Sequence, residues 1–446
     1  MTEVATIFAL SSAPGRAGVA VVRICGPQSG AILDQVATPR PTPRMAAIRR
    51  IRHPDTGEIL DEALVLWFPA PHSFTGNDVV EFHVHGGHAV VQAVLNMLAA
   101  MPGCRLAEAG EFARRAFVNG KLDLTMAEGL ADLIDAETEA QRKQALRQAG
   151  GVLDALYEGW RESLITALAL VEAAIDFSDE GDVGSKTYTQ AALIAGELES
   201  VIRRHLDDDH RGEILRDGFQ VVLAGPPNVG KSSLLNALAR RDAAIVSEEA
   251  GTTRDVIEVR LDLDGLPVIV SDTAGVRDAA GAIEREGIRR TLQRSRAADL
   301  IVWLMDASSP EPTLPAELAA MADRTLWVVN KADLQSAHPA SGIPEGALSI
   351  SVKTGDGIAA LSKRLAAIAT ERIAPSEHPG LTQARHRTNL EDCTRWLAAF
   401  RNGDPDQLEL RAEDLRLAAN ALGRLTGRVD AEQVLDQIFH RFCIGK

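Results

Sequence analysis

Several short runs in the first 118 residues are strand-like, because they are apolar or alternate between apolar and polar positions. These runs are "GVAVVRI" (18–24), "EALVLWF" (62–68) and "VVEFHVH" (79–85), and a stretch of helical periodicity follows the Gly86-Gly87 pair. A period of two indicates strands with one buried face, whereas a period of about 3.6 indicates an amphipathic helix. The pattern therefore predicts a compact α+β N-terminal domain over residues 1–118.

Helical spacing takes over between residues 119 and 216 and returns between 373 and 446. An acidic stretch with glycines, "DFSDEGDVGSK" (176–186), is expected to break the first helical segment. Between the two segments, strands alternate with helices over residues 217–372, and an Asp264-Gly265 turn predicts a hairpin. Because neither helical segment is large, we expect them to form one discontinuous helical domain, interrupted by an inserted doubly wound α/β domain. The predicted fold class is multidomain.

Composition excludes several classes of protein. The 446-residue chain has a formal charge of -15, which argues against binding by general neutralisation of nucleic-acid phosphates. Its cysteines (Cys25, Cys104, Cys393 and Cys443) lack metal-site or disulfide-framework spacing and are expected to be free thiols. No apolar run approaches the roughly 18 residues of a membrane span. We therefore expect a cytoplasmic protein without a membrane segment.

The strongest chemical motif is "GPPNVGKS" (225–232), which follows a predicted strand and precedes a predicted helix. It matches the GxxxxGKS phosphate loop. In that context backbone N–H groups form a concave anion site, the Lys231 ammonium reaches the outer phosphates, and the Ser232 hydroxyl ligates magnesium. The motif predicts a nucleoside triphosphate site.

A second motif, "NKAD" (330–333), stands at the end of a later strand and predicts the base. The Asp333 carboxylate accepts hydrogen bonds from N1–H and the exocyclic amine of guanine, whereas adenine would leave this buried acceptor unpaired. "SVK" (351–353) is expected to close on the base, with Val352 where a smaller alanine is usual. The expected nucleotide is GTP.

Two further motifs, "AGTTRD" (250–255) and "SDTAG" (271–275), lie between these sites. Asp272 is expected to hold magnesium through water, and the Gly275 N–H is expected to bind the γ-phosphate. One hydroxyl of the Thr252-Thr253 pair completes the magnesium shell only while the γ-phosphate is present. This region is predicted to be a nucleotide-dependent switch.

The position after the DxxG motif holds Val276, where Ras-like GTPases orient the attacking water with a glutamine. Valine neither donates nor accepts a hydrogen bond, so another group must position the water, and Glu284 is the candidate carboxylate. No arginine finger is evident in the sequence. Asn228 and the Ser247 hydroxyl are candidates to bind a monovalent cation beside the phosphates.

The motif set resembles that of the tRNA modification GTPase family MnmE (TrmE), and the resemblance covers the whole chain. It is carried by "TIFALSSAPGRAGVAVVRICG", "HGGH", "GEFARRAFVNGKLDLTMAEGLADLIDAET", "AAIDFSDE", the nucleotide motifs and the terminal "FCIGK". The resemblance implies a tetrahydrofolate-binding and dimerisation domain (1–118), a helical domain (119–216 and 373–446, ending in the CIGK motif) and an inserted Ras-like P-loop GTPase domain, the G domain (217–372).

The resemblance also implies an activity. A potassium- and magnesium-dependent GTPase, active as a homodimer and in a heterotetramer with the FAD-containing MnmG, would modify the wobble uridine (position 34) of certain tRNAs. The product would be a 5-carboxymethylaminomethyl or aminomethyl group, with 5-formyl- or 5,10-methylene-tetrahydrofolate as the one-carbon donor.

Individual roles carried over from the family are as follows. Glu284 matches the catalytic carboxylate, and Ser232 and Thr253 match the magnesium ligands. The potassium site matches Asn228, Ser247 (where threonine is usual), the backbone carbonyl of Glu249 (where an apolar residue is usual) and Thr252. The residues expected to contact GTP are Asn228, Val229, Gly230, Lys231, Ser232, Ser233, Ser247, Glu248, Glu249, Ala250, Gly251, Thr252, Thr253, Asp272, Thr273, Ala274, Gly275, Asn330, Lys331, Asp333, Ser351, Val352 and Lys353.

The family's folate contacts match Arg23, Glu81, Lys121 and Lys446. A pterin offers donors to Glu81, and the glutamate tail and ring carbonyl offer anionic or acceptor groups to the three cations. Cys443 either faces the one-carbon chemistry as a catalytic residue or packs as a small apolar side chain.

Three alternatives to these assignments are weighed. His83, His85 and His88 in "HVHGGH" raise a zinc site, which we disfavour because alternating strand residues point to opposite faces and no carboxylate cluster is evident. A GTP-controlled ribosome-assembly or RNA-binding switch would carry a basic module after the G domain, whereas residues 373–446 are helical and have no excess of basic residues. A folate-dependent transferase with an incidental GTPase predicts modification that survives the loss of GTP hydrolysis.

Overall fold

The structure is a computed structural model that describes residues 5–176, 181–241, 258–272, 294–309, 314–316, 318–334, 343–373, 380–429, 432–442 and 444–445. Contacts divide the chain into two compact units. The first contains Met1–Ala131, Gln148–Ala191 and Gly403–Lys446, and the second contains Asp132–Arg147 and Ala192–Asn402. The predicted domain boundaries at 118, 216 and 372 stay a prediction.

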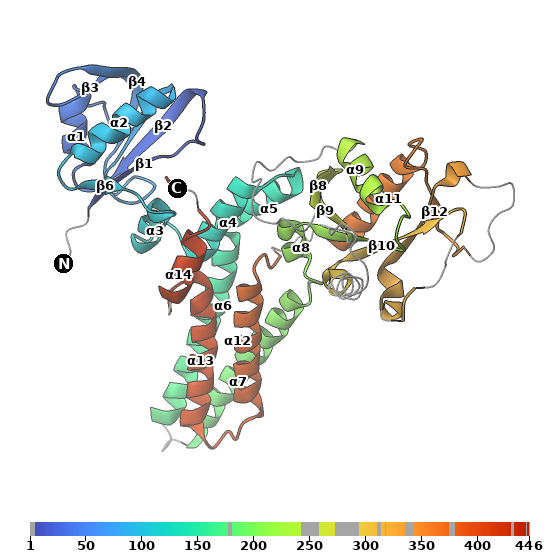
Figure 1. Cartoon of the computed structure of the whole chain (residues 1–446). Coiled ribbons are helices and arrows are strands. Elements are labelled where there is room, and N and C mark those ends of the chain that lie inside the picture. The colour runs from blue at the N-terminus through green and yellow to red at the C-terminus, as the bar shows by residue number, and fades with distance from the viewer. Residues whose placement is uncertain are drawn as a thin grey trace, which may run out of the picture. The chain divides into compact units, whose positions relative to one another are not determined.

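A six-stranded sheet forms the N-terminal part of the first unit, in the order β3-β4-β5-β2-β1-β6. The pairing is antiparallel throughout except between β1 and β6, which run parallel. Helices α1 (Ser29–Val36) and α2 (His88–Ala100) cover one face, as Figure 1 shows. The strands are β1 (Thr6–Leu10), β2 (Ala17–Cys25), β3 (Ala47–Arg52), β4 (Ile59–Phe68), β5 (Val79–Gly86) and β6 (Cys104–Leu106).

The alternation of side chains along each strand explains how this sheet packs against its helices. Val80, Phe82 and Val84 of β5 are buried against α1 and α2, whereas the intervening residues lie on the opposite face. Part of that second face is covered by α3 (Glu111–Val118), whose Phe112 is completely buried beside Cys25 of β2. The predicted α+β N-terminal domain is confirmed.

Helices from both ends of the chain pack together in the first unit. α6 (Val152–Asp176) lies alongside α13 (Leu408–Thr426) in Figure 1. Arg416 of α13 pairs with Glu172 of α6 at 3.0 Å. α14 (Glu432–Phe439) packs on α3 and α4 (Leu124–Asp135). The predicted discontinuous helical domain is therefore confirmed.

The break predicted at residues 176–186 is only partly correct. α7 (Gly181–Leu206) begins at Gly181, so residues 181–186 are helical, while 177–180 lie outside the described residues. The two glycines and the acidic residues suggested a loop, but each glycine costs only about 1 kcal/mol in a helix interior. A long helix with an apolar face offsets that cost by tertiary packing.

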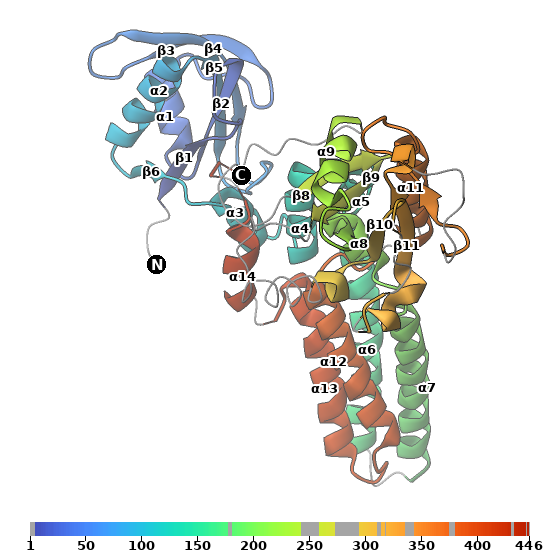
Figure 2. The same ribbon diagram turned by 45° about the vertical axis from the view of Figure 1, so that its right-hand side comes forward.

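The G-domain sheet in the second unit has the order β12-β11-β10-β7-β9-β8 and is parallel except at β8. Helices α9 (Lys231–Arg241) and α11 (Ile358–Ile373) bury their apolar sides in one core cluster with this sheet, as Figure 2 illustrates. The strands are β7 (Phe219–Ala224), β8 (Glu258–Leu263), β9 (Leu266–Asp272), β10 (Leu300–Asp306), β11 (Thr325–Asn330) and β12 (Leu348–Ser349), with short helical turns η1 (Ala319–Arg324) and η2 (Ala332–Leu334). The predicted inserted α/β domain is confirmed.

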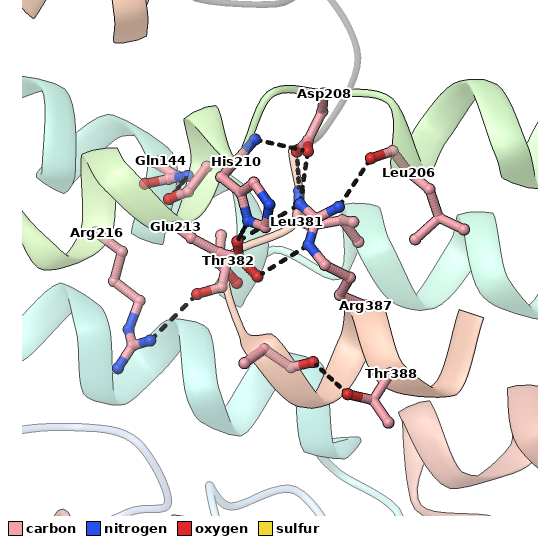
Figure 3. A network of polar contacts seen from close by, with 12 residues as sticks. Gln144, Leu206, Asp208, His210, Glu213, Arg216, Leu381, Thr382, Arg387 and Thr388 are labelled. Atoms are coloured by element: carbon pink, nitrogen blue, oxygen red, sulfur yellow. Dashed lines mark hydrogen bonds and ion pairs between the residues drawn. The ribbon is translucent and has the colours of Figure 1, made fainter. Parts of the chain in front are cut away.

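A polar network ties the two chain connections of the G domain together (Figure 3). Arg387 of α12 (Ala384–Asn402) donates to the Leu206 carbonyl at 2.8 Å and to Asp208 at 2.7 Å, and its Nε lies 3.4 Å from Glu213 of α8 (Arg211–Asp217). The three charged side chains are mostly buried, which strengthens their attraction. One guanidinium thus joins the segment entering the G domain to the segment leaving it.

The β8–β9 hairpin also reaches the helical segment of the second unit. Its turn, Asp264-Gly265, places the Gly265 carbonyl 3.1 Å from the Ala140 N–H in the first turn of α5 (Glu139–Ala149). First-turn N–H groups have no partner within their own helix, so this carbonyl satisfies one of them. Arg260 of β8 pairs with Glu137 at 3.1 Å beside it.

Among the helices in the described parts of the chain, none combines the length and the apolar character that crossing a bilayer requires.

Candidate functional site

The phosphate loop joins β7 to α9, so the Lys231 side chain starts at the first turn of a helix whose N–H groups point into the loop. The Lys231 ammonium donates to the carbonyls of Gly225 and Pro226, both at 2.9 Å. Burial lowers the pKa of this ammonium, and the carboxylate of Asp272 opposes that shift. The cation is therefore held inside the loop where an anion would bind.

Glycine is required at one point of this loop. Gly230 has φ +100°, and a Cβ there would lie 2.4 Å from the Asn330 side-chain nitrogen. A larger residue would both strain the backbone and displace Asn330. Asn228, at φ +60°, takes the left-handed conformation that asparagine tolerates better than most residues.

Ser232 and Asp272 form the expected magnesium pair. The Ser232 hydroxyl donates a short hydrogen bond to the Asp272 carboxylate, which stands at the end of β9, next to β7 in the sheet. Both supply the hard oxygen donors that magnesium prefers. The donor chemistry therefore fits the ion, and the roles of Ser232 and Asp272 in holding it stay a prediction.

The base-recognition motifs converge at the carboxyl ends of β11 and β12. Asn330 donates to the Val229 carbonyl at 2.8 Å and accepts from the Val352 N–H at 3.1 Å, so one buried amide joins the phosphate loop to the "SVK" loop. Ser351 donates to Asp333 at 2.7 Å, and Lys353 lies 3.9 Å from the same carboxylate. Val352 is larger than the alanine that is usual at this position, but it joins the network through its backbone N–H.

Sequence reasoning missed Asp306 in this region. It ends β10, pairs in register with Asn330, and binds the Lys331 ammonium at 2.6 Å. Lys331 has φ +64°, so this ion pair helps to hold a strained turn of the "NKAD" motif. An acidic residue at the carboxyl end of a buried parallel strand was the available signal.

The switch region cannot be compared with the sequence predictions, which stay predictions there. Its residues lie outside the described part of the chain: Ser247, Glu248, Glu249, Ala250, Gly251, Thr252, Thr253, Thr273, Ala274, Gly275, Val276 and Glu284.

A second polar site lies on the N-terminal sheet. Arg23 of β2 and Glu81 of β5 are direct partners in the ladder, and their side chains pair at 2.9 Å. The guanidinium carbon lies 5.8 Å from the centre of the Phe74 ring and 5.6 Å from that of Phe112. A charged pair beside the exposed Phe74 ring suits a flat ligand with a donor edge. Phe74 and Phe112 carried no signal in the sequence.

Of the other two residues expected to contact folate, Lys121 lies against the loop before β5. Its Cε would be 3.3 Å from a Cβ placed on Gly76. Lys446, like Cys443, lies outside the described residues. The assignment of these four residues to folate stays a prediction.

The reason given against zinc in "HVHGGH" was wrong for two of the histidines. Glu81, His83 and His85 are two residues apart in one strand and therefore share a face. His83 lies 3.4 Å from Glu81, and His85 binds Asp61 of β4 at 2.8 Å. In the described ranges there is no group of three or more histidine, cysteine or acidic side chains placed to hold a metal.

Comparisons with known proteins cover the whole chain. The family model of the TrmE N-terminus matches residues 6–121, and that of the MnmE helical domain matches residues 124–443. The tRNA modification GTPase MnmE of Parvibaculum lavamentivorans is 54% identical, with 99% of this chain and 100% of that protein covered. The protein of the same name from Maricaulis maris is 52% identical, with 99% of both covered.

A human relative extends the comparison beyond bacteria. The mitochondrial 5-taurinomethyluridine-tRNA synthase subunit GTPB3 of Homo sapiens is 49% identical, and the match covers 99% of this chain and 93% of that protein. Matches at this identity over nearly the full length of both chains leave no part of the fold unaccounted for. The chain therefore belongs to the MnmE family of tRNA modification GTPases.

Proposed function

We propose that the protein hydrolyses GTP to drive the formation of an aminomethyl-type group on the wobble uridine of certain tRNAs. The observation that carries the first half is the Asn330 amide, which bonds to Val229 in the phosphate loop and to Val352 in the base loop. Phosphate and guanine recognition are thereby built into one rigid unit. The tRNA-modification part of the proposal rests on family membership and on the Arg23–Glu81 site.

Each residue of the nucleotide site has a role in this proposal. Lys231 would neutralise the outer phosphates, and Ser232 and Asp272 would hold magnesium, which would offset the negative charge of the phosphates. Asp333 selects guanine, and Ser351 orients the Asp333 carboxylate through its 2.7 Å hydrogen bond. Glu284 orients the attacking water in place of the glutamine that Val276 replaces.

The one-carbon chemistry belongs to the N-terminal domain in this proposal. Arg23, Glu81, Lys121 and Lys446 bind a 5-formyl- or 5,10-methylene-tetrahydrofolate, the folate supplies the methylene when bound, and an FAD-containing partner of the MnmG type completes the reaction. The Glu81 carboxylate, paired with Arg23 at 2.9 Å, supplies oxygen acceptors for the donor edge of a pterin.

The decisive test is nucleoside analysis of tRNA from a strain that lacks the gene. We expect the aminomethyl-type modification of the wobble uridine to disappear and to return when the full chain is supplied. Intact modification in the deletion strain would exclude the proposal.

Hydrolysis is expected to depend on potassium. Asn228, Ser247, the Glu249 carbonyl and Thr252 are proposed to hold the ion beside the phosphates, where it supplies the positive charge that no arginine finger provides. Replacing potassium by sodium should lower GTP turnover by about 100-fold, the usual scale for losing one stabiliser of transition-state charge. Steady-state turnover at constant ionic strength measures this, and equal rates in the two salts would refute the potassium site.

A further inference from the structure

The end of the chain adds to the edge of the N-terminal sheet within the first unit. Ile444 forms an antiparallel bridge with Ala109, and the Ser11 hydroxyl donates to the Gly445 carbonyl at 2.8 Å. The Ile444 side chain is 53% exposed, so main-chain contacts hold this segment in place. The arrangement is an isolated main-chain bridge beside the sheet, at residues that follow β6 and β1.

Position 445 must be glycine for the end of the chain to dock in this way. Gly445 has φ +105°, and a Cβ there would lie 2.2 Å from the Leu10 carbonyl oxygen and 3.0 Å from the Ser11 Cα. A side chain would be excluded both by the backbone conformation and by the contact. The close approach also brings the Gly445 carbonyl within reach of the Ser11 hydroxyl.

An apolar anchor fixes the chain on the other side of Cys443. Phe439 and Phe442 are buried in a cluster with Ala113 and Leu124, and their ring centres lie 5.9 Å apart. The residues before and after Cys443 are thus held by separate contacts, while Cys443 itself lies outside the described residues.

Ser11 connects the docked segment, Ile444–Gly445, to the Arg23–Glu81 pair through the β1–β2 ladder. It follows β1, and its N–H donates to the Val21 carbonyl at 2.7 Å, which continues the β1–β2 ladder. Ala9, two residues earlier, pairs in register with Arg23. The tail therefore docks within two residues of the ladder position that carries the proposed folate site.

We propose that Ser11 is a positioning residue for the one-carbon reaction: its hydroxyl latches the Ile444–Gly445 main chain onto the end of β1, two residues from the ladder position of Arg23. The inference rests on the proposed function for its chemical role, but the latch itself is independent of tRNA and folate.

Removal of Lys446 by a carboxypeptidase specific for basic residues tests the latch. Cleavage requires the last residues to leave the sheet, so its rate follows the undocked fraction when docking is fast. Ser11→Ala removes one hydrogen bond and should speed cleavage by about fivefold. Ser11→Thr, which keeps the hydroxyl, should restore the wild-type rate.

Ser12→Ala is the matched control, because the Ser12 hydroxyl accepts from the Val21 N–H and makes no hydrogen bond to the described tail residues, Ile444 and Gly445. It should leave cleavage unchanged. Mass spectrometry of the intact full-length protein measures each rate without altering the tail sequence. Cleavage of Ser11→Ala at the wild-type rate would overturn the latch.

The positioning role is tested by the wobble-uridine content of tRNA from cells in which each variant replaces the natural chain. Ser11→Ala should lower the modification while GTP turnover and thermal unfolding stay unchanged, and Ser11→Thr should restore it. Faster cleavage together with normal modification would overturn the positioning role. Failure of the proposed function itself looks different, since the wild-type chain would then support no modification although the cleavage rates still differ.

Discussion

Glu284→Ala is expected to lower GTP turnover by about 100-fold or more while leaving GTP affinity within about twofold. General acid–base groups contribute about 100- to 10,000-fold, and Val276 leaves the usual water-orienting position without a polar group. The affinity should be preserved because the nucleotide is proposed to be held by other residues, such as Lys231 and Asp333. Single-turnover hydrolysis and equilibrium binding of a fluorescent GTP analogue measure the two quantities separately.

Glu286→Ala provides the matched control for this experiment, since it removes a carboxylate two residues away in the sequence. It should leave turnover nearly unchanged. If Glu284→Ala loses GTP binding in parallel with turnover, Glu284 has a structural role and the water must be positioned by another group.

Removing the last four residues, "CIGK" (443–446), is expected to abolish wobble-uridine modification while GTP turnover stays within about twofold. The truncation ends the chain at Phe442, so the buried aromatic cluster that seats α14 remains complete. The truncation removes the segment that docks on Ser11 and Ala109, together with Lys446. Nucleoside analysis and steady-state GTP hydrolysis give the two readouts.

Cys443→Ser in the full-length chain separates the thiol from the tail, with Cys104→Ser as the control at another free thiol. Loss of modification only in Cys443→Ser would assign chemistry to the thiol, and retention would assign it a packing role. Normal modification by the truncated protein would remove the tail from the active site altogether.

Local patterns were sufficient where the structure depends on local contacts. The alternation in "VVEFHVH" predicts β5 because Val80, Phe82 and Val84 share one buried face. The edge strand β3 was not predicted, since Ile48 is exposed and only Ile51 is fully buried, so its apolar residues do not follow a single face. Edge strands have a partner on one side only, which weakens the pattern that sequence reasoning uses.

Sequence reasoning predicted more of the nucleotide site than of the site on the N-terminal sheet. The phosphate loop is one contiguous motif, so the chemistry of Lys231 and Ser232 follows from spacing alone. Arg23 and Glu81 are 58 residues apart, and Ser11 and Gly445 are 434 apart. Those pairs depend on strand register and on where the C-terminus docks, and the single sequence contains neither. Only the family resemblance indicated the first pair, and nothing indicated the second.

The β8–β9 hairpin sets a length requirement for exchanging the G domain. The open end of the hairpin carries Asp272, the last residue of β9. At the turn, the Gly265 carbonyl accepts a hydrogen bond from the first turn of α5. Between the two ends, residues Glu258 to Leu263 of β8 pair with β9. Six residues of strand span about 20 Å. A grafted GTPase module with a hairpin two residues shorter would keep its nucleotide pocket but fall short of the helix. The length of this hairpin thus limits which GTPase modules the helical scaffold can accept.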